Sequence, residues 1–224
     1  PGGARAGGEG HEAGIGPRIF HGQWSSPSAG QIGGKWQIYA GGGDGVLYAL
    51  DSEPRKAEDS SFLRKVWWFD AVPPEYKAKD GKPIKYPAAE GPSEINATPV
   101  FYKNRVYVAI GQDPEHGEGV GRLVCVDATK SGDVTGKALI WDYKGIHRSI
   151  STVSIDPDTG LLFVGDFSGF VHKIIWNAET VALSAVDRLR GSHVPLYEPL
   201  GLRVSVGLSP LGWWEFGDGA EVGG

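Results

Sequence analysis

Apolar residues along the chain occur in short runs that are rich in β-branched and aromatic side chains, and Gly, Asp, Asn or Pro separate the runs. Runs of this length and composition are typical of half-buried β-strands, and the residues between them are those that tight hairpins require. The runs fall into three sets. The first begins at 25–27, turns at Gly33-Gly34 and continues as 36–40, 46–51 and 66–69; the second is 97–102, a turn at Lys103-Asn104, 105–110, 121–127 and 138–143; the third is 151–155, 161–164 and 170–174.

Each set has the same internal order of strand, short turn, strand, Gly/Asp turn and strand. Gly45, Gly121 and Gly169 occupy equivalent places in the three copies. In the first two copies a fourth run that contains tryptophan follows. Four antiparallel strands per unit, with an aromatic on the last, is the plan of a propeller blade, whereas the strands of a sandwich would not repeat in sequence. The pattern therefore predicts an all-β partial β-propeller of about three four-stranded antiparallel blades that belong to a larger ring.

The pattern also divides the chain. We expect a poorly structured N-terminal segment at 1–20, blades over 21–176 and a divergent tail of unknown fold at 177–224. Residues 71–93 carry five prolines and are interpreted as an inserted loop that acts as a linker, with a functional loop as the alternative. Residues 181–190 look mildly helical, and no fourth strand is expected after the third copy. Because the chain begins with proline and lacks methionine, we expect its true N-terminus to be missing. Because three blades do not close a ring, we expect the remaining blades to be missing from this chain.

Composition narrows the range of functions. The 35 glycines and 15 prolines are too many for a helical protein, and a net charge of −5 gives no reason to expect nucleic acid as a partner. The sequence contains no apolar run long enough to serve as a transmembrane segment. A single cysteine, Cys125, excludes an intrachain disulfide and is expected to be a buried strand thiol. His172, at a strand position, is expected to be packed in the protein interior.

Residues 43–51, Gly-Asp-Gly-Val-Leu-Tyr-Ala-Leu-Asp, match the repeat of one known family nearly residue for residue. The chain resembles the PQQ-like (pyrroloquinoline quinone) β-propeller repeat family over residues 21–176. The stretches 21–27 and 111–119 are similar to bacterial PQQ-binding-like repeat proteins. The resemblance implies a periplasmic or otherwise extracytoplasmic location.

The family that the chain resembles is functionally mixed. Some are cofactor-free scaffolds, such as the propeller lipoprotein that assists outer-membrane assembly, and others are quinoprotein alcohol dehydrogenases that hold PQQ and calcium. Many of the dehydrogenases stack PQQ on a ring formed by two adjacent bonded cysteines, which the lone Cys125 cannot form. We therefore expect a non-catalytic binding or scaffold module without a cofactor, whose partner is a protein or a small-molecule ligand. A fragment of a PQQ-dependent dehydrogenase is the alternative.

Three loops are candidates for a ligand site. Alignment of the copies at Ser26, Thr98 and Thr152 makes the segments 21–24, 93–96 and 147–150 equivalent. They precede the innermost strands, so in a propeller they should gather at one mouth of the central channel, where ligands commonly bind. The candidate ligand-binding residues are His21, Gln23, Trp24, Glu94, Asn96, His147 and Arg148. The alternative is that these loops hold neighbouring blades together by hydrogen bonds.

The insertion at 113–119 is a weaker candidate. Asp113, Glu115 and Glu118 offer oxygen ligands suited to a hard cation such as calcium, although the spacing does not match the twelve-residue calcium loop. An acidic surface loop without a metal is the favoured interpretation.

Overall fold

The computed structural model describes residues 24–57, 60–84, 93–112 and 120–177, and the backbone of strands at 6–7, 182–190, 194–195, 205–208 and 214–217. Within these residues the chain is all-β, apart from one 3-10 turn at Pro74–Tyr76. No described helix is long and apolar enough to cross a membrane.

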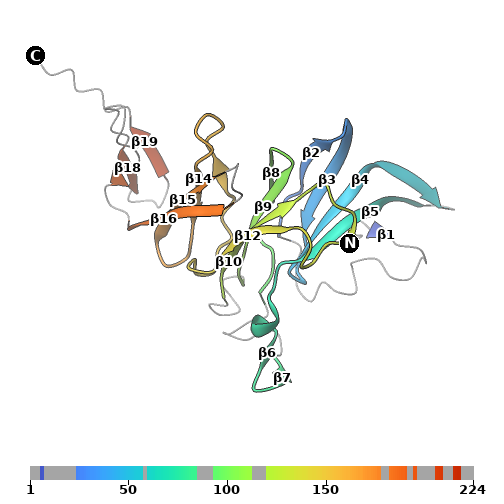
Figure 1. Ribbon diagram of the computed structural model, residues 1–224, viewed down its shortest axis with the longest axis horizontal. Helices are drawn as coiled ribbons and strands as arrows, with labels where there is room; N and C mark the ends of the chain where they lie inside the picture. The colour runs from blue at the N-terminus through green and yellow to red at the C-terminus, as the bar shows by residue number, and fades with distance from the viewer. Residues whose placement is uncertain are drawn as a thin grey trace, which may run out of the picture.

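Three antiparallel sheets follow one another along the chain, and in each of them consecutive strands lie side by side (Figure 1). The first contains β2 (Ser28–Ile32), β3 (Lys35–Gly41), β4 (Val46–Ala57) and β5 (Ser60–Asp70). The second contains β8 (Val100–Tyr102), β9 (Arg105–Ile110), β10 (Arg122–Asp127) and β12 (Leu139–Tyr143). The third contains β13 (Ser154–Ile155), β14 (Leu162–Gly165), β15 (Phe170–Asn177) and β16 (Ala182–Arg190).

The last of these strands corrects the sequence-based expectation for the third copy. Residues 182–190 are not helical; they form β16, which pairs with β15 over its full length, from Asn177 opposite Ala182 to Phe170 opposite Arg190. The open hydrogen-bonding edge of β15 outweighs a weak helical preference, because each residue that pairs with it satisfies backbone groups that would otherwise lack a partner. The third copy therefore has the fourth strand that the sequence pattern did not reveal.

The remaining strands are short. A parallel strand β1 (Ala6–Gly7) pairs with β5, β6 (Ala78–Lys79) and β7 (Lys82–Pro83) form a small hairpin within the insertion, and β17 (Val194–Pro195), β18 (Ser205–Leu208) and β19 (Trp214–Gly217) form a separate antiparallel sheet. The insertion at 71–93 was expected to lack regular structure, yet its described part contains this hairpin and the 3-10 turn.

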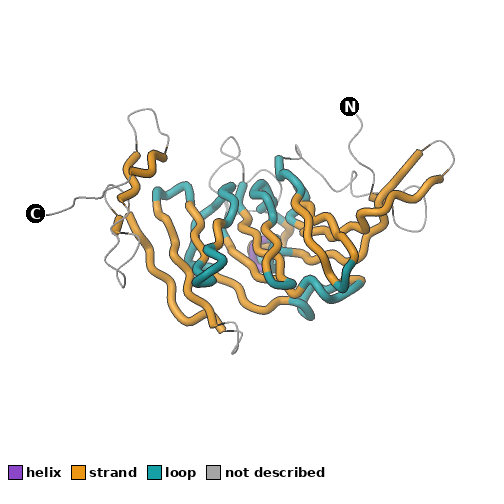
Figure 2. The backbone as a smooth tube through the Cα atoms, turned by 90° about the horizontal axis from the view of Figure 1, so that it is seen from above, coloured by secondary structure: helices purple, strands orange, loops and turns teal. Residues whose placement is uncertain are grey.

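The three main sheets stack face to face, as the view in Figure 2 also shows. The alternating side chains of β9 explain why the second sheet has two buried faces. Val106 and Val108 join a core with the first sheet, whereas Tyr107 and Ala109 join a core with the third. A sheet that is buried on both faces needs apolar residues at successive positions, so the uninterrupted apolar runs of β9 and β10 follow from the stacking.

Equivalent residues build the two cores. In the first sheet Tyr39, Ala49 and Trp67 lie opposite one another on adjacent strands and face the second sheet. In the second sheet Tyr107, Cys125 and Trp141 occupy the same register and face the third sheet. The corresponding positions of the third sheet are Phe163, Lys173 and Asp187, so the third sheet does not repeat this apolar set.

A short strand from the second repeat completes the first sheet. β11 (Gly132–Asp133) runs parallel to β5 opposite Trp67 and Trp68, and the Val134 N–H donates to the Trp68 carbonyl at 3.0 Å. The Trp67 indole N–H donates to the carbonyl of Ala128 at 3.2 Å. Segment 128–134, called the latch below, therefore joins the second repeat to the outer strand of the first.

The start of the insertion is fixed to the second sheet. The buried guanidinium of Arg122 donates through Nη1 to the Ala71 carbonyl at 2.9 Å and through Nε to Asp142 at 2.8 Å. Lys144 pairs with Glu75, and these two side chains are about half exposed. The chain that leaves the first sheet is thereby held beside β10 and beside the residue that follows β12.

Candidate binding site

The segments 21–24, 93–96 and 147–150, which lead into the three sheets, are called the first, second and third entry loops. The second and third cross from one sheet to the next in equivalent ways. The Ile95 N–H donates to the Gly42 carbonyl of the first sheet at 3.1 Å, and the Ser149 N–H donates to the Ile110 carbonyl of the second at 3.3 Å. The strand registers make Gly42 and Ile110 equivalent. The alignment of the copies that was made from sequence therefore agrees with the backbone hydrogen bonds.

The second and third entry loops meet at Gly111. Glu94 and Gly111 form an antiparallel bridge, with N···O distances of 2.8 and 3.0 Å. A Cβ atom at Gly111 would lie 2.7 Å from the Ser149 nitrogen and 3.0 Å from Cα of Arg148. Because bridged residues direct their side chains to the same face, Glu94 is on the side of Gly111 where Arg148 and Ser149 lie. The structure thus brings Glu94 and Arg148, from two different sheets, around one glycine.

Glu94 and Asn96 share a face of the second entry loop. Their neighbours Ile95 and Ala97 are buried in the core between the first and second sheets. Side chains alternate along an extended segment, so Glu94 and Asn96 face the other way. Both are buried, Glu94 to 1% exposure and Asn96 to 9%. Neither the amide nitrogen nor the amide oxygen of Asn96 has a hydrogen-bond partner within the described parts of the chain.

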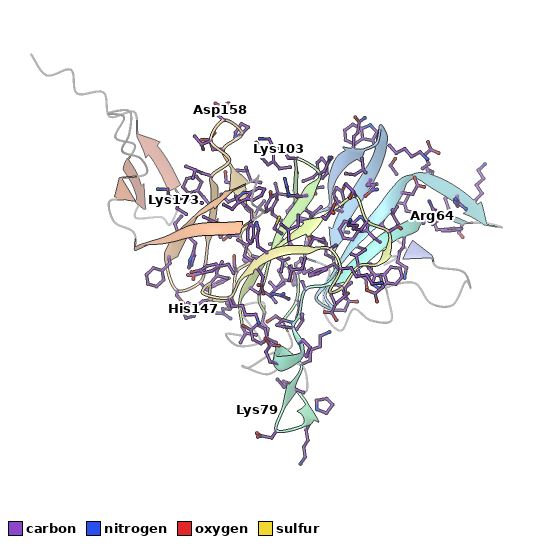
Figure 3. The ribbon with its side chains drawn as sticks, viewed as in Figure 1. Arg64, Lys79, Lys103, His147, Asp158 and Lys173 are labelled. Carbon is purple, nitrogen blue, oxygen red and sulfur yellow. The ribbon has the colours of Figure 1, made fainter. Side chains whose placement is uncertain are left out.

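His147 lies at the end of the sheets opposite the turns that carry Lys103 and Asp158, as Figure 3 shows, and Arg148 follows it in the chain. The His147 side chain is exposed, and its backbone N–H donates to Oδ2 of Asp166 at 3.2 Å. The Arg148 guanidinium stacks on the Phe167 ring at 4.5 Å. A Cβ atom at Gly121 would lie 2.0 Å from the His147 carbonyl oxygen, so the third entry loop rests on the start of β10 and only glycine fits there.

The sequence analysis missed a buried polar cluster beside this loop. His172 lies between the second and third sheets, with Nε2 2.8 Å from Oδ2 of Asp166 and Nδ1 3.3 Å from the Tyr143 hydroxyl. Both His172 and Asp166 have fully buried side chains. An ionised carboxylate only accepts hydrogen bonds, so Nε2 carries the hydrogen and donates a hydrogen bond to Asp166.

Burial alone would raise the pKa of Asp166, but hydrogen bonds from His172 and from the N–H groups of Phe170 and His147 outweigh burial, so its pKa lies below the ordinary value. The first sheet shows a related contact, in which the Tyr48 hydroxyl donates to Asp44 at 2.6 Å. In both sheets the ring lies two residues after the first residue of the strand, a signal that the sequence could have supplied.

Trp24 is 62% exposed and precedes Ser25, whose hydroxyl donates to the Ala97 carbonyl at 2.8 Å. Ser25 follows Trp24 and Ala97 follows Asn96, so this hydrogen bond joins the residues next to Trp24 and Asn96. The remaining sequence candidates lie outside the described residues: His21 and Gln23 of the ligand set, and Asp113, Glu115 and Glu118 of the metal set. Among the described residues, no group of three or more His, Cys, Asp or Glu side chains is placed to hold a metal ion.

The arrangement offers hydrogen-bonding and apolar groups, and the one thiol is in no position to act as a nucleophile. Cys125 is buried between the second and third sheets, and burial raises its pKa to about 12. No protein-family model matches the chain, and no curated protein matches it either.

Proposed function

We propose that the chain is part of a PQQ-like β-propeller that acts as a non-catalytic binding or scaffold module in the periplasm or elsewhere outside the cytoplasm. The observation that carries the proposal is the equivalence of the entry loops. The second and third entry loops each cross from one four-stranded sheet to the next through the same hydrogen bond, from Ile95 to Gly42 and from Ser149 to Ile110. Repeated four-stranded meanders that stack face to face are the plan of propeller blades.

The entry-loop end is the proposed binding surface for a protein or small-molecule ligand. Glu94 and Arg148 come from consecutive sheets and flank Gly111, and Asn96 adds a buried amide on the Glu94 face. Polar groups that converge from several elements fix the orientation of a ligand. The backbone of the same loops also joins the sheets, so the loops hold the sheets together and present side chains at once.

The single cysteine of the chain, Cys125, cannot form the ring of two adjacent bonded cysteines on which many quinoprotein dehydrogenases stack PQQ. This favours the non-catalytic module over the dehydrogenase alternative.

Isothermal titration of PQQ with calcium into the folded full chain tests this proposal. We expect no saturable heat, because a chain with one cysteine cannot form the bonded cysteine ring that holds PQQ in many quinoprotein dehydrogenases. Saturable binding near one-to-one stoichiometry, together with reduction of a dye acceptor in the presence of an alcohol, would contradict the proposal and identify a dehydrogenase. Fractionation of the source cells tests the location, and recovery of the protein with cytoplasmic markers would count against it.

A further inference from the structure

One carboxylate connects the interior of the protein to the third entry loop. Oδ2 of Asp166 accepts a hydrogen bond from Nε2 of His172 at 2.8 Å and another from the backbone N–H of His147 at 3.2 Å. Its other oxygen, Oδ1, accepts from the N–H groups of Ser168 and Phe170 at 2.9 and 3.2 Å. Asp166 therefore joins its own turn and the core between the second and third sheets to the first residue of the loop.

The turn that begins at Asp166 also supports Arg148. The Phe167 N–H donates to the Arg148 carbonyl at 3.1 Å, and the Arg148 guanidinium lies 4.5 Å from the centre of the Phe167 ring. Phe167 is 44% exposed, so this contact lies at the surface of the protein. Because Phe167 directly follows Asp166, a shift of Asp166 would displace the ring on which Arg148 stacks.

The loop has a second attachment, which leaves its first residues to Asp166. The Ser149 hydroxyl donates to the Gly165 carbonyl at 2.7 Å, and the Ser149 N–H donates to the Ile110 carbonyl at 3.3 Å. These bonds fix the loop at Ser149. The position of the two residues before Ser149 depends on the carboxylate.

His172 determines where that carboxylate can lie. The end of an aspartate side chain has a broad rotational preference, so a neighbouring group has to fix its orientation. His172 is itself held firmly: it is fully buried, its Nδ1 lies 3.3 Å from the Tyr143 hydroxyl, and the Tyr143 ring packs edge-on against it at 5.5 Å. A rigid buried donor of this kind locks the group that it binds.

We propose that His172 is a positioning residue for the candidate binding surface. By holding the Asp166 carboxylate, it fixes the backbone of the third entry loop at His147 and with it the place of Arg148. This inference rests on the proposed binding function, because it assigns to that surface a loop that is ordered before any ligand arrives. Preorganised loops lose less conformational entropy on binding.

Amide hydrogen exchange of the full chain, followed residue by residue with NMR, tests the proposal. His172→Phe keeps a ring of similar size but has no donor, so the amides of His147 and Phe167 should exchange roughly tenfold faster, because a hydrogen bond to a charged group is lost. His172→Gln places an amide N–H near the position of Nε2, and we expect it to restore slow exchange at both amides. If His172→Gln exchanges as fast as His172→Phe, the donor is not what positions the loop, and the proposal fails.

Ile174→Ala is the matched control for loss of packing. Ile174 is fully buried in the same strand and the same core as His172, but its side chain forms no hydrogen bond. This variant should speed exchange at His147 only as much as it speeds exchange at the amides of β9 and β10. A selective acceleration at His147 in Ile174→Ala would show that packing alone orders the loop, and would overturn the positioning role.

The unmodified chain offers a test that does not depend on the folding of any variant. Nitrogen-15 NMR of the His172 ring at neutral pH should show a slowly exchanging hydrogen on Nε2. A ring without a hydrogen on Nε2 cannot donate to Asp166 and would overturn the proposal. None of these measurements uses a ligand, so their failure removes the positioning role and leaves the proposed binding function, which the titration with PQQ and calcium tests separately.

Discussion

At the scale of single residues, the pair of Asp166 and His172 shows how a buried charge is accommodated between two sheets. Asp166 accepts hydrogen bonds from the His172 ring and from backbone N–H groups of its own turn and of the third entry loop. The carboxylate therefore connects the core between the second and third sheets to the candidate binding site. Hydrogen bonds to the charged form keep its pKa low despite complete burial.

We expect Asp166→Asn to lower the free energy of unfolding by about 1–3 kcal/mol at pH 7, because several buried donors lose a charged acceptor. A carboxyl group whose pKa is lower in the folded state than its ordinary value of about 3.9 stabilises the fold above that pH, and this stabilisation disappears as the pH falls through the folded-state pKa. Urea unfolding at pH 7 and near pH 3 should therefore give a smaller difference between the two proteins at the acidic pH. An equal difference in the free energy of unfolding at the two pH values would contradict a lowered pKa for Asp166.

Cys125 should be unreactive in the folded protein. Its thiol is buried between two sheets and its pKa is raised to about 12, so almost no thiolate forms at pH 8. Labelling with a disulfide reagent at pH 8 should be slow without denaturant and fast above the urea midpoint. Rapid labelling of the folded chain would show that the second and third sheets do not pack as described.

At the scale of elements, hairpin turns illustrate what sequence can predict. The turns at Gly33-Gly34 and Lys103-Asn104 were expected, and both residues of each turn have positive φ, which matches the twist of the flanking strands. The fourth strand of the third sheet was not predicted, because the run Ala182–Arg190 lacks the aromatic residue that marks β5 and β12. Its strand conformation comes from pairing with β15, which the local sequence does not encode.

Lys103 has a φ of 47°, a conformation that is strained for lysine but open to glycine. We expect Lys103→Gly to increase the free energy of unfolding by about 0.5–1 kcal/mol, after the loss of a weak contact with the Tyr102 ring. The change should appear as a higher urea midpoint. Gly34→Ala is the comparison in the opposite direction. Gly34 has a φ of 79° and nothing lies within 4 Å of a Cβ atom placed there, so only backbone strain should lower the urea midpoint of this variant. A lower midpoint for Lys103→Gly would contradict the turn assignment.

At the scale of the whole molecule, stability depends on the cores between the sheets. Trp67 is fully buried in the core that the first and second sheets share, and its indole N–H bonds to the latch. Trp36 is exposed on the first sheet. Two tryptophans in one sheet thus have opposite environments, which allows a controlled test of the stacking.

We expect Trp67→Ala to lower the free energy of unfolding by about 3–5 kcal/mol, as large-to-small changes in cores do. Trp36→Ala should change it by less than about 0.5 kcal/mol. Chemical denaturation followed by fluorescence and by circular dichroism measures both values. Similar effects for the two variants would mean that the sheets do not share a core.

The candidate site was predictable only in part. Alignment of the copies placed Glu94, Asn96, His147 and Arg148 in equivalent loops, and these loops lie at one end of the sheets. The role of Gly111 as the meeting point of Glu94 and Arg148 was not predictable, because it depends on backbone atoms that lie far apart in sequence. Burial of Asn96 also follows from the stacking of whole sheets and leaves no signal in the local sequence.

The latch has a consequence for synthesis on the ribosome. The stretch of β5 at Trp67 and Trp68 obtains its neighbour β11 from residues 132–133, so this part of the edge stays open until the latch has been synthesised. An open strand edge can pair with other nascent chains. Slow translation between the first repeat and the latch should therefore favour aggregation, and a chaperone that shields strand edges would be needed most during that interval.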